Sequence, residues 1–141
     1  MINKNLSSWI NLHFFYKEVL SLMKILNQQK RLNIITLKDY QSVDILCKSQ
    51  HLNINRKQII DASIISNKVE ALNDFCKFNV MDKKNIIFVD DNIFHLTDPK
   101  LKNYSIFLAS WCYLPKEYLL IAKENNIHVL HDIKDLINEL Y

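Results

Sequence analysis

The 141-residue chain contains no glycine and only two prolines. Glycine is the residue that most readily adopts positive φ and lets a backbone approach a phosphate group closely. A phosphate-binding Walker loop and a dinucleotide-binding fingerprint both require glycines, so the sequence excludes both kinds of site. The lack of glycine is also unusual for turns, which commonly use this residue where φ is positive.

An excess of charge of one sign and a long apolar run are lacking too. Lys and Arg number 18 against 15 Asp and Glu, and the net charge of +3 is small and scattered. Nucleic-acid-binding domains gather their cations on one face, so we expect no nucleic-acid partner. No run approaches the roughly 18 apolar residues of a membrane span, and polar residues interrupt the amino-terminal segment. We therefore expect a cytoplasmic protein without a membrane partner.

Cysteine is scarce, and its spacing is not that of a metal site. Cys47, Cys76 and Cys112 lie in apolar runs without paired spacing or a Cys-x-x-Cys motif. This pattern favours reduced, buried cysteines in a cytosolic protein and argues against a zinc site.

The hydrophobic pattern predicts alternating helices and strands. Apolar residues at three- and four-residue spacing indicate a first helix from about residue 14 to 29. Nearly continuous apolar runs are typical of strands buried on both faces of a parallel sheet. We expect strands at 32–37, 85–89, 105–110 and 127–130, with 59–65 as a strand or an extended connection. Further helices are expected at 40–50, 67–79, 116–125 and 132–140.

This alternation predicts an α/β fold with a mostly parallel sheet. A hydrophobic content of 49% is enough for one core, so we expect a single domain spanning residues 1–141. Residues 1–14 are an uncertain amino-terminal segment. Ile10, Leu12 and Phe14 alternate with polar residues there, so a strand and the start of a helix both remain open.

Polar residues at the carboxyl ends of the predicted strands are the candidate functional groups, because ligands of open parallel sheets bind there. Thr36 ends one strand, Asp90 and Asp91 end the strongest one, and Lys68 lies in the first turn of a helix. A hydroxyl, an ammonium group and two carboxylates together suit a phosphate group with Mg²⁺. Of the five histidines, none has metal-ligand spacing, and only His95 could reach this pocket.

Each of these residues also has an ordinary structural interpretation. Threonine is common in strands, a lysine in a first helical turn is usually a solvated charge, and adjacent acids often form a turn or a helix cap. Their joint occurrence in this order favours the functional interpretation.

The ordered series resembles the motifs of haloacid-dehalogenase superfamily phosphatases. Residues 32–36 resemble the second motif, an apolar strand ending in Thr or Ser. Lys68 resembles the third-motif lysine, and residues 86–92 are similar to the fourth motif, an apolar strand followed by two acids. The stretch 108–115 adds to the match, with Cys112 where relatives often carry glycine. The resemblance covers roughly residues 15–141.

The resemblance implies a Rossmannoid three-layer sandwich with little or no cap, and it implies roles for the matching residues. Thr36 would bind the phosphoryl group, Lys68 would offset its charge, and Asn92 would contact the substrate. Asp90 and Asp91 would hold Mg²⁺ as the cofactor. Thr36 and Lys68 would then be the catalytic residues, and the substrate a phosphorylated small molecule or phosphoprotein.

The sequence departs from the family pattern at the first motif. The family's nucleophile is an aspartate in an Asp-x-Asp motif on the first, central strand, but the first aspartate here is Asp39, beyond Thr36. Either residues 9–16 supply a degenerate first strand, or that strand is missing and comes from a partner chain or another copy. Losing a covalent nucleophile costs on the order of 10⁴-fold or more in rate.

The sequence therefore predicts a magnesium-dependent phosphomonoester phosphatase core that is impaired or inactive alone. The alternative is a catalytically inactive binding module on the same scaffold, since a fold does not determine a function.

Overall fold

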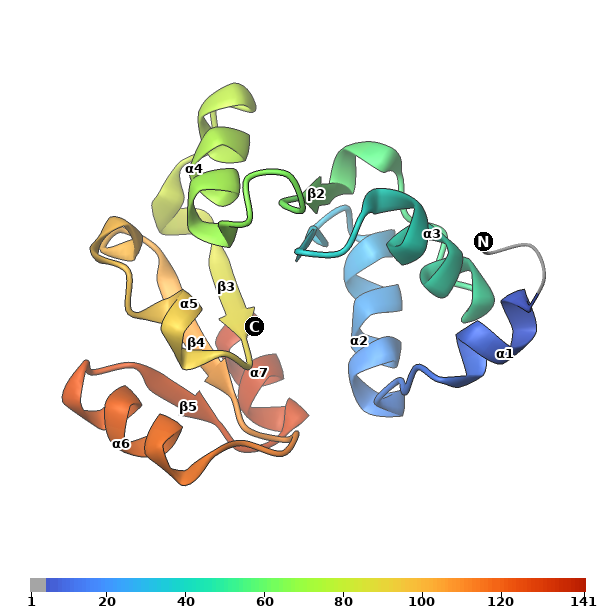
Figure 1. The fold of residues 1–141 in the computed structure, drawn as a ribbon. Coiled ribbons are helices and arrows are strands. Elements are labelled where there is room, and N and C mark those ends of the chain that lie inside the picture. Colours follow the sequence, from blue (N-terminus) through green and yellow to red (C-terminus); the bar gives the residue numbers. More distant parts are fainter. Residues whose placement is uncertain (1–4) are drawn as a thin grey trace. The chain divides into compact units, whose positions relative to one another are not determined.

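The computed structural model describes residues 5–141 and divides into two compact units, Met1–Ala71 and Leu72–Tyr141. The boundary falls inside helix α4 (Lys68–Phe78), which is labelled in Figure 1. A single domain spanning residues 1–141 stays a prediction. No helix among residues 5–141 is long and apolar enough to cross a membrane.

The first unit pairs two short parallel strands with helices. Its elements are α1 (Leu6–Asn11), α2 (Lys17–Gln28), β1 (Ile34–Thr36), α3 (Tyr40–Ser49), a 3₁₀ turn (Arg56–Gln58), β2 (Ile59–Asp61) and the start of α4 (Lys68–Phe78). Strands β1 and β2 pair in parallel from Ile34 opposite Ile59 to Thr36 opposite Asp61. Its core cluster consists of buried Val43, Cys47, Leu52, Ile54 and Ile59.

The structure of the amino-terminal segment decides whether residues 9–16 form a strand. Trp9 and Ile10 are helical residues of α1, and no strand is formed between Leu12 and Tyr16. A degenerate first strand at residues 9–16 is therefore wrong. The Trp9 and Ile10 carbonyls accept backbone hydrogen bonds from Leu12 and His13, which close the last helical turn of α1.

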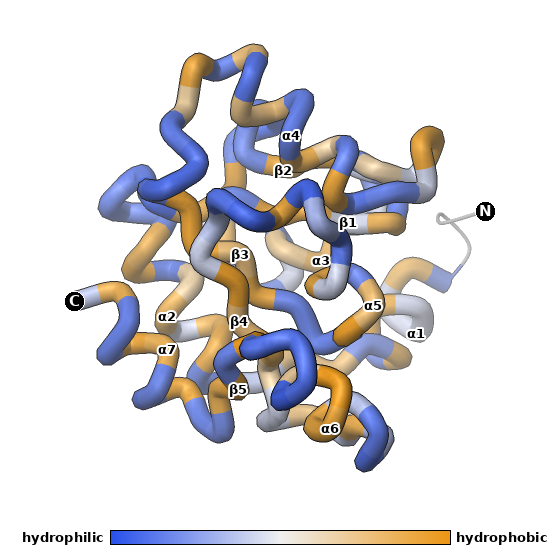
Figure 2. Tube along the Cα trace, turned by 90° about the vertical axis from the view of Figure 1, so that its left-hand side faces the viewer, coloured by the Kyte–Doolittle hydropathy of each residue, from blue (hydrophilic) through white to orange (hydrophobic). Residues whose placement is uncertain are grey.

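The second unit is built on a three-stranded parallel sheet in the order β3-β4-β5. Its elements after α4 are a 3₁₀ turn (Lys83–Asn85), β3 (Ile87–Asp90), α5 (Ile93–Leu96), a 3₁₀ turn (Pro99–Leu101), β4 (Ser105–Ala109), α6 (Lys116–Glu124), β5 (His128–Leu130) and α7 (Ile133–Leu140). Helix α5 packs against β3 and β4, while α6 and α7 pack against β5. Figure 2 shows the tube through β3 and β4 largely in the orange of hydrophobic residues.

The core of the second unit follows from this apolar pattern. Its largest fully buried side chains are Leu108 and Leu130 from the sheet, and Ile93, Leu96, Leu101 and Cys76 around it. Burial of each such leucine or isoleucine contributes roughly 1.5–3 kcal/mol. Strand β3 is therefore held in place by its pairing with β4 and by the packing of α5.

Helix termination without glycine follows one repeated pattern. Four helices, α2, α3, α4 and α6, are followed two positions after their last residue by a residue with positive φ. These residues are Lys30, His51, Val80 and Asn126, with φ of 57°, 57°, 53° and 54°. After α2, for example, the Lys30 N–H donates to the Asn27 carbonyl at 3.0 Å and the Arg31 N–H to the Leu26 carbonyl at 2.8 Å. This pair of bonds is the Schellman motif, which normally favours glycine at the left-handed position.

The α/β class with parallel strands is confirmed, because every strand pairing among the described residues is parallel. The described strands form two sheets, of two and three strands. Asp132 and Asp135 form a capping box at the start of α7. The three-layer sandwich of the haloacid-dehalogenase type stays a prediction.

Candidate functional site

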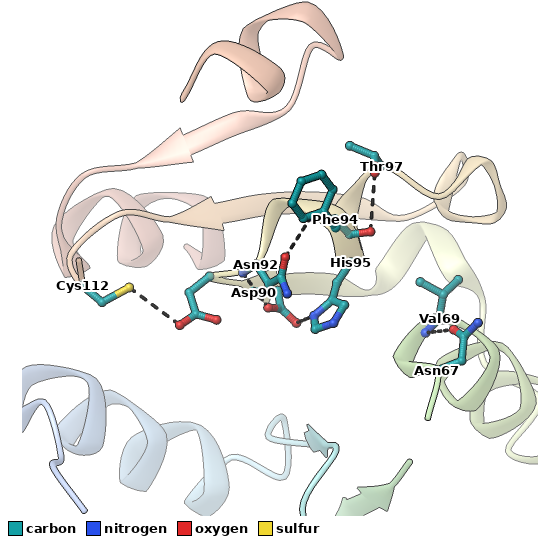
Figure 3. Close-up of polar contacts among 9 residues, drawn as sticks. Asn67, Val69, Asp90, Asn92, Phe94, His95, Thr97 and Cys112 are labelled. Atoms are coloured by element: carbon teal, nitrogen blue, oxygen red, sulfur yellow. Dashed lines mark hydrogen bonds and ion pairs between the residues drawn. The ribbon is translucent and has the colours of Figure 1, made fainter. Parts of the chain in front are cut away.

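The second unit places Asp90 at the carboxyl end of β3 as the only buried charged side chain among residues 5–141. The residue is 6% exposed. Its Oδ1 accepts a hydrogen bond from the Asn92 N–H at 2.9 Å, and its Oδ2 lies 3.1 Å from His95 Nδ1 (Figure 3). A buried charge is expensive unless its polar atoms are hydrogen-bonded, and both oxygens of Asp90 have a hydrogen-bond partner.

Asp91 differs from its neighbour in exposure and contacts. Its side chain is exposed, and its Oδ2 accepts a weak hydrogen bond from the Cys112 thiol at 3.8 Å (Figure 3). Burial, followed by the negative charge of Asp91, raises the pKa of the Cys112 thiol. Cys112 is therefore a protonated thiol beside the acidic pair. It is only half-buried, unlike Cys47 and Cys76, and all three cysteines are free of disulfides.

Asn92 serves first as a helix cap. Its side-chain oxygen accepts the Phe94 N–H at 3.1 Å and begins the four-residue helix α5. The buried Ile93 and Leu96 anchor that helix, so the backbone carrying His95 is held against the sheet. The predicted contact of Asn92 with a substrate stays a prediction. His95 contacts Asp90, and its place in the proposed phosphate pocket stays a prediction.

In the first unit, Thr36 ends β1 as expected. Its Oγ1 accepts a hydrogen bond from the Lys38 N–H at 2.9 Å. A hydroxyl oxygen can accept one bond while its own hydrogen is donated elsewhere. Thr36 therefore retains a donor for a phosphoryl oxygen.

Asp61 is a carboxylate at the same sheet edge that the sequence analysis did not single out. It ends β2 opposite Thr36 and accepts hydrogen bonds from the Tyr40 N–H at 2.8 Å and the Ser63 N–H at 2.9 Å. The Ser63 hydroxyl also donates to it, and these Ser63 bonds are the main cause that lowers the pKa of Asp61. The sequence feature that could have identified Asp61 is its place directly after the apolar pair at 59–60.

Lys68 is the first residue of α4, as the sequence predicts. The helix start is capped by Asn67, whose Oδ1 accepts the Val69 and Glu70 N–H groups at 3.0 and 3.1 Å. Thr36 and Lys68 belong to the first unit, and Asp90 and Asp91 to the second. The convergence of these four residues at one site stays a prediction.

The acidic pair has a limited donor set for a metal ion. Within residues 5–141 no group of three or more His, Cys, Asp or Glu side chains is arranged to hold one. Mg²⁺, however, keeps several water ligands and is often bound through one or two carboxylates together with substrate phosphates. Two adjacent carboxylates are within the number of protein ligands that Mg²⁺ commonly takes, and a magnesium site at this pair stays a prediction.

No family model, curated protein or solved structure matches the chain. The resemblance to haloacid-dehalogenase phosphatases consequently rests on the ordered motifs of the sequence and stays a prediction.

Proposed function

We propose that the chain is a cytoplasmic, haloacid-dehalogenase-like core that binds Mg²⁺ and a phosphate group weakly and hydrolyses phosphomonoesters poorly or not at all by itself. Asp90 and Asp91 would hold the metal, while Thr36, Lys68 and Asn92 would contact the phosphorylated ligand. Bound Mg²⁺ would supply positive charge that offsets the charge of the phosphoryl oxygens.

The observation that carries the proposal is the environment of Asp90. A buried carboxylate at the carboxyl end of a parallel strand, hydrogen-bonded at both oxygens, is held in one orientation before any ligand arrives. Stability alone gives little reason to bury a charge at this position, since an apolar residue would avoid the desolvation cost. Strand carboxyl ends are also where ligands of parallel α/β sheets bind.

The sheet topology supports the idea that one strand is lacking. In the family, the first strand lies between the strands that correspond to β1 and β3. Here β3 is the outer strand of its sheet, and β1 has a neighbour among the described strands only in β2. We propose that a strand from a partner chain or from another copy completes the fold.

Low activity follows from the missing nucleophile. No aspartate precedes Asp39, so no residue of the chain can take the place of the first-motif aspartate ahead of Thr36. A covalent nucleophile raises the rate by on the order of 10⁴-fold or more, and the positioning groups that remain do not restore this loss.

The test is hydrolysis of para-nitrophenyl phosphate with Mg²⁺ by the wild-type chain and by Asp90→Asn. Asp74→Asn is the matched control, because it removes the same charge from an exposed position of α4. Residual activity that falls only in Asp90→Asn supports a weak enzyme. Equal rates in wild type and Asp90→Asn, or none in either, remove the enzymatic part of the proposal for the isolated chain.

A binding module without catalysis is the second candidate, and the absent Asp-x-Asp motif favours it. Two observations would distinguish the enzyme from the binding module. An upstream reading frame that encodes a strand ending in Asp-x-Asp would favour the enzyme. A chain that folds stably alone, binds a phosphorylated ligand and turns nothing over would favour the binding module.

A further inference from the structure

We propose that His95 is a positioning residue that fixes the Asp90 carboxylate for Mg²⁺ binding; this inference rests on the proposed function. The sequence motifs assign no role to His95. In the structure its Nδ1 lies 3.1 Å from Oδ2 of the buried Asp90.

The chemistry of the two groups determines the direction of this hydrogen bond. An ionised carboxylate can only accept, so the imidazole must donate through Nδ1–H. Neutral His95 is then the Nδ1–H tautomer, and its Nε2 carries the free lone pair. With the Asn92 N–H on Oδ1, the bond from His95 on Oδ2 holds the Asp90 carboxyl plane at both ends.

The local fold holds the imidazole in place in turn. His95 lies on α5 between Ile93 and Leu96, which are 0% and 2% exposed and fix the short helix against β3 and β4. The His95 side chain is 25% exposed, whereas that of Asp90 is 3% exposed. The imidazole is therefore partly accessible to solvent, whereas the carboxylate that it contacts is buried.

Groups that hydrogen-bond a metal-ligating carboxylate commonly change metal affinity by 10–100-fold when they are removed. A carboxylate held in one orientation does not lose rotational freedom when the metal binds. We therefore expect His95→Ala to weaken Mg²⁺ binding by about 10–100-fold. His95→Asn places an amide N–H near the former Nδ1 position, so it should recover most of the affinity.

Two measurements on the full chain test the inference. The first is the tautomer of His95 from ¹⁵N chemical shifts of the imidazole at a pH where it is neutral; the Nδ1–H form is expected. An Nε2–H tautomer would overturn the inference irrespective of any metal. The second is isothermal titration calorimetry with Mg²⁺ for wild type, His95→Ala, His95→Asn and a control, His131→Ala. His131 is an exposed histidine of the same unit whose ring contact is with Ser110.

The outcomes separate this inference from the proposed function. Mg²⁺ binding that weakens in His95→Ala, recovers in His95→Asn and is unchanged in His131→Ala supports both. Binding that is equal in wild type and His95→Ala overturns the role of His95 and leaves the metal site standing. No Mg²⁺ binding by the wild-type chain overturns the proposed metal site and the positioning role with it.

Discussion

Thr36 and Asp61 are register partners at the last positions of the parallel strands β1 and β2. Asp61 connects this strand end to the start of α3, because it accepts the Tyr40 N–H as well as the Ser63 N–H. Thr36 binds the Lys38 N–H in the intervening turn. The two side chains thus hold the turn between β1 and α3 from both strands, and the position of the Thr36 hydroxyl depends on them.

Replacing Asp61 should destabilise the protein. In Asp61→Ala the Tyr40 and Ser63 amides lose their acceptor, and such a loss costs about 1–3 kcal/mol. Urea unfolding measures the change in the free energy of unfolding. Asp74→Ala, which removes an exposed carboxylate from α4, is the control and should cost much less. Equal losses in the two variants would show that Asp61 does not hold the turn.

The stability of the protein at acid pH should also depend on the Asp61 carboxylate. The Ser63 hydrogen bonds hold the pKa of Asp61 below its ordinary value of 3.8. A carboxyl group whose pKa is lowered by folding stabilises the protein above its unfolded pKa, and this contribution is lost as the pH falls through the folded pKa. We expect wild-type stability to fall below about pH 4 and Asp61→Ala to fall less steeply. Parallel acid curves for the two proteins would contradict this assignment.

The strands were predictable where burial on both faces leaves an uninterrupted apolar run. The run at 86–89 gave both β3 and the position of Asp90 at its end. Helix α5 was not predictable in the same way, because four residues are too few to show a helical period. His95 could be placed near the acids only because it follows them closely along the chain.

Asp61 was missed for a different reason. Its importance depends on the pairing of β1 with β2 and on the start of α3, 21 residues away. Those relationships are tertiary, and a three-residue strand gives little periodicity from which to infer them. The sequence shows that glycine is absent, but it does not show which residues adopt positive φ after the helices in its place.

Val80 should be a site where a single glycine stabilises the protein. It has φ of 53° after α4, and its side chain is 91% exposed, so it packs against little. The left-handed region costs a non-glycine residue roughly 1–2 kcal/mol, and the greater freedom of glycine in the unfolded chain offsets part of that gain. Val80→Gly should therefore raise the free energy of unfolding by up to about 1 kcal/mol.

Asn126 provides the control for this change, since it occupies the equivalent position after α6 with φ of 54°. Asparagine tolerates the left-handed region better than a β-branched residue does. Asn126→Gly should therefore change thermal stability less than Val80→Gly. A lower melting temperature for Val80→Gly would contradict the backbone explanation.

The thiol of Cys112 should report the charge of Asp91. Burial and then the Asp91 charge raise the pKa of this thiol. Because the thiolate is the reactive form, Asp91→Asn should speed alkylation of Cys112 by iodoacetamide near neutral pH. One pKa unit changes the thiolate fraction about tenfold, which sets the scale of the effect.

Mass spectrometry of tryptic peptides identifies the modified cysteine in that experiment. Cys47 and Cys76 are 5% and 1% exposed and should react more slowly than Cys112 in the folded protein. Cys112→Ser should remove the fast-reacting site. If Cys112 is alkylated at the same rate with and without the Asp91 carboxylate, the Asp91 charge does not affect the Cys112 thiol.

A Mg²⁺ titration followed through backbone amide NMR signals tests the central claim most directly. The wild-type chain should show saturable shifts at Asp90, Asp91 and Asn92, and the double variant Asp90→Asn, Asp91→Asn should lose them while its remaining spectrum stays folded. Wild-type signals that do not move with Mg²⁺, or that move equally in the double variant, would contradict a magnesium site at the end of β3.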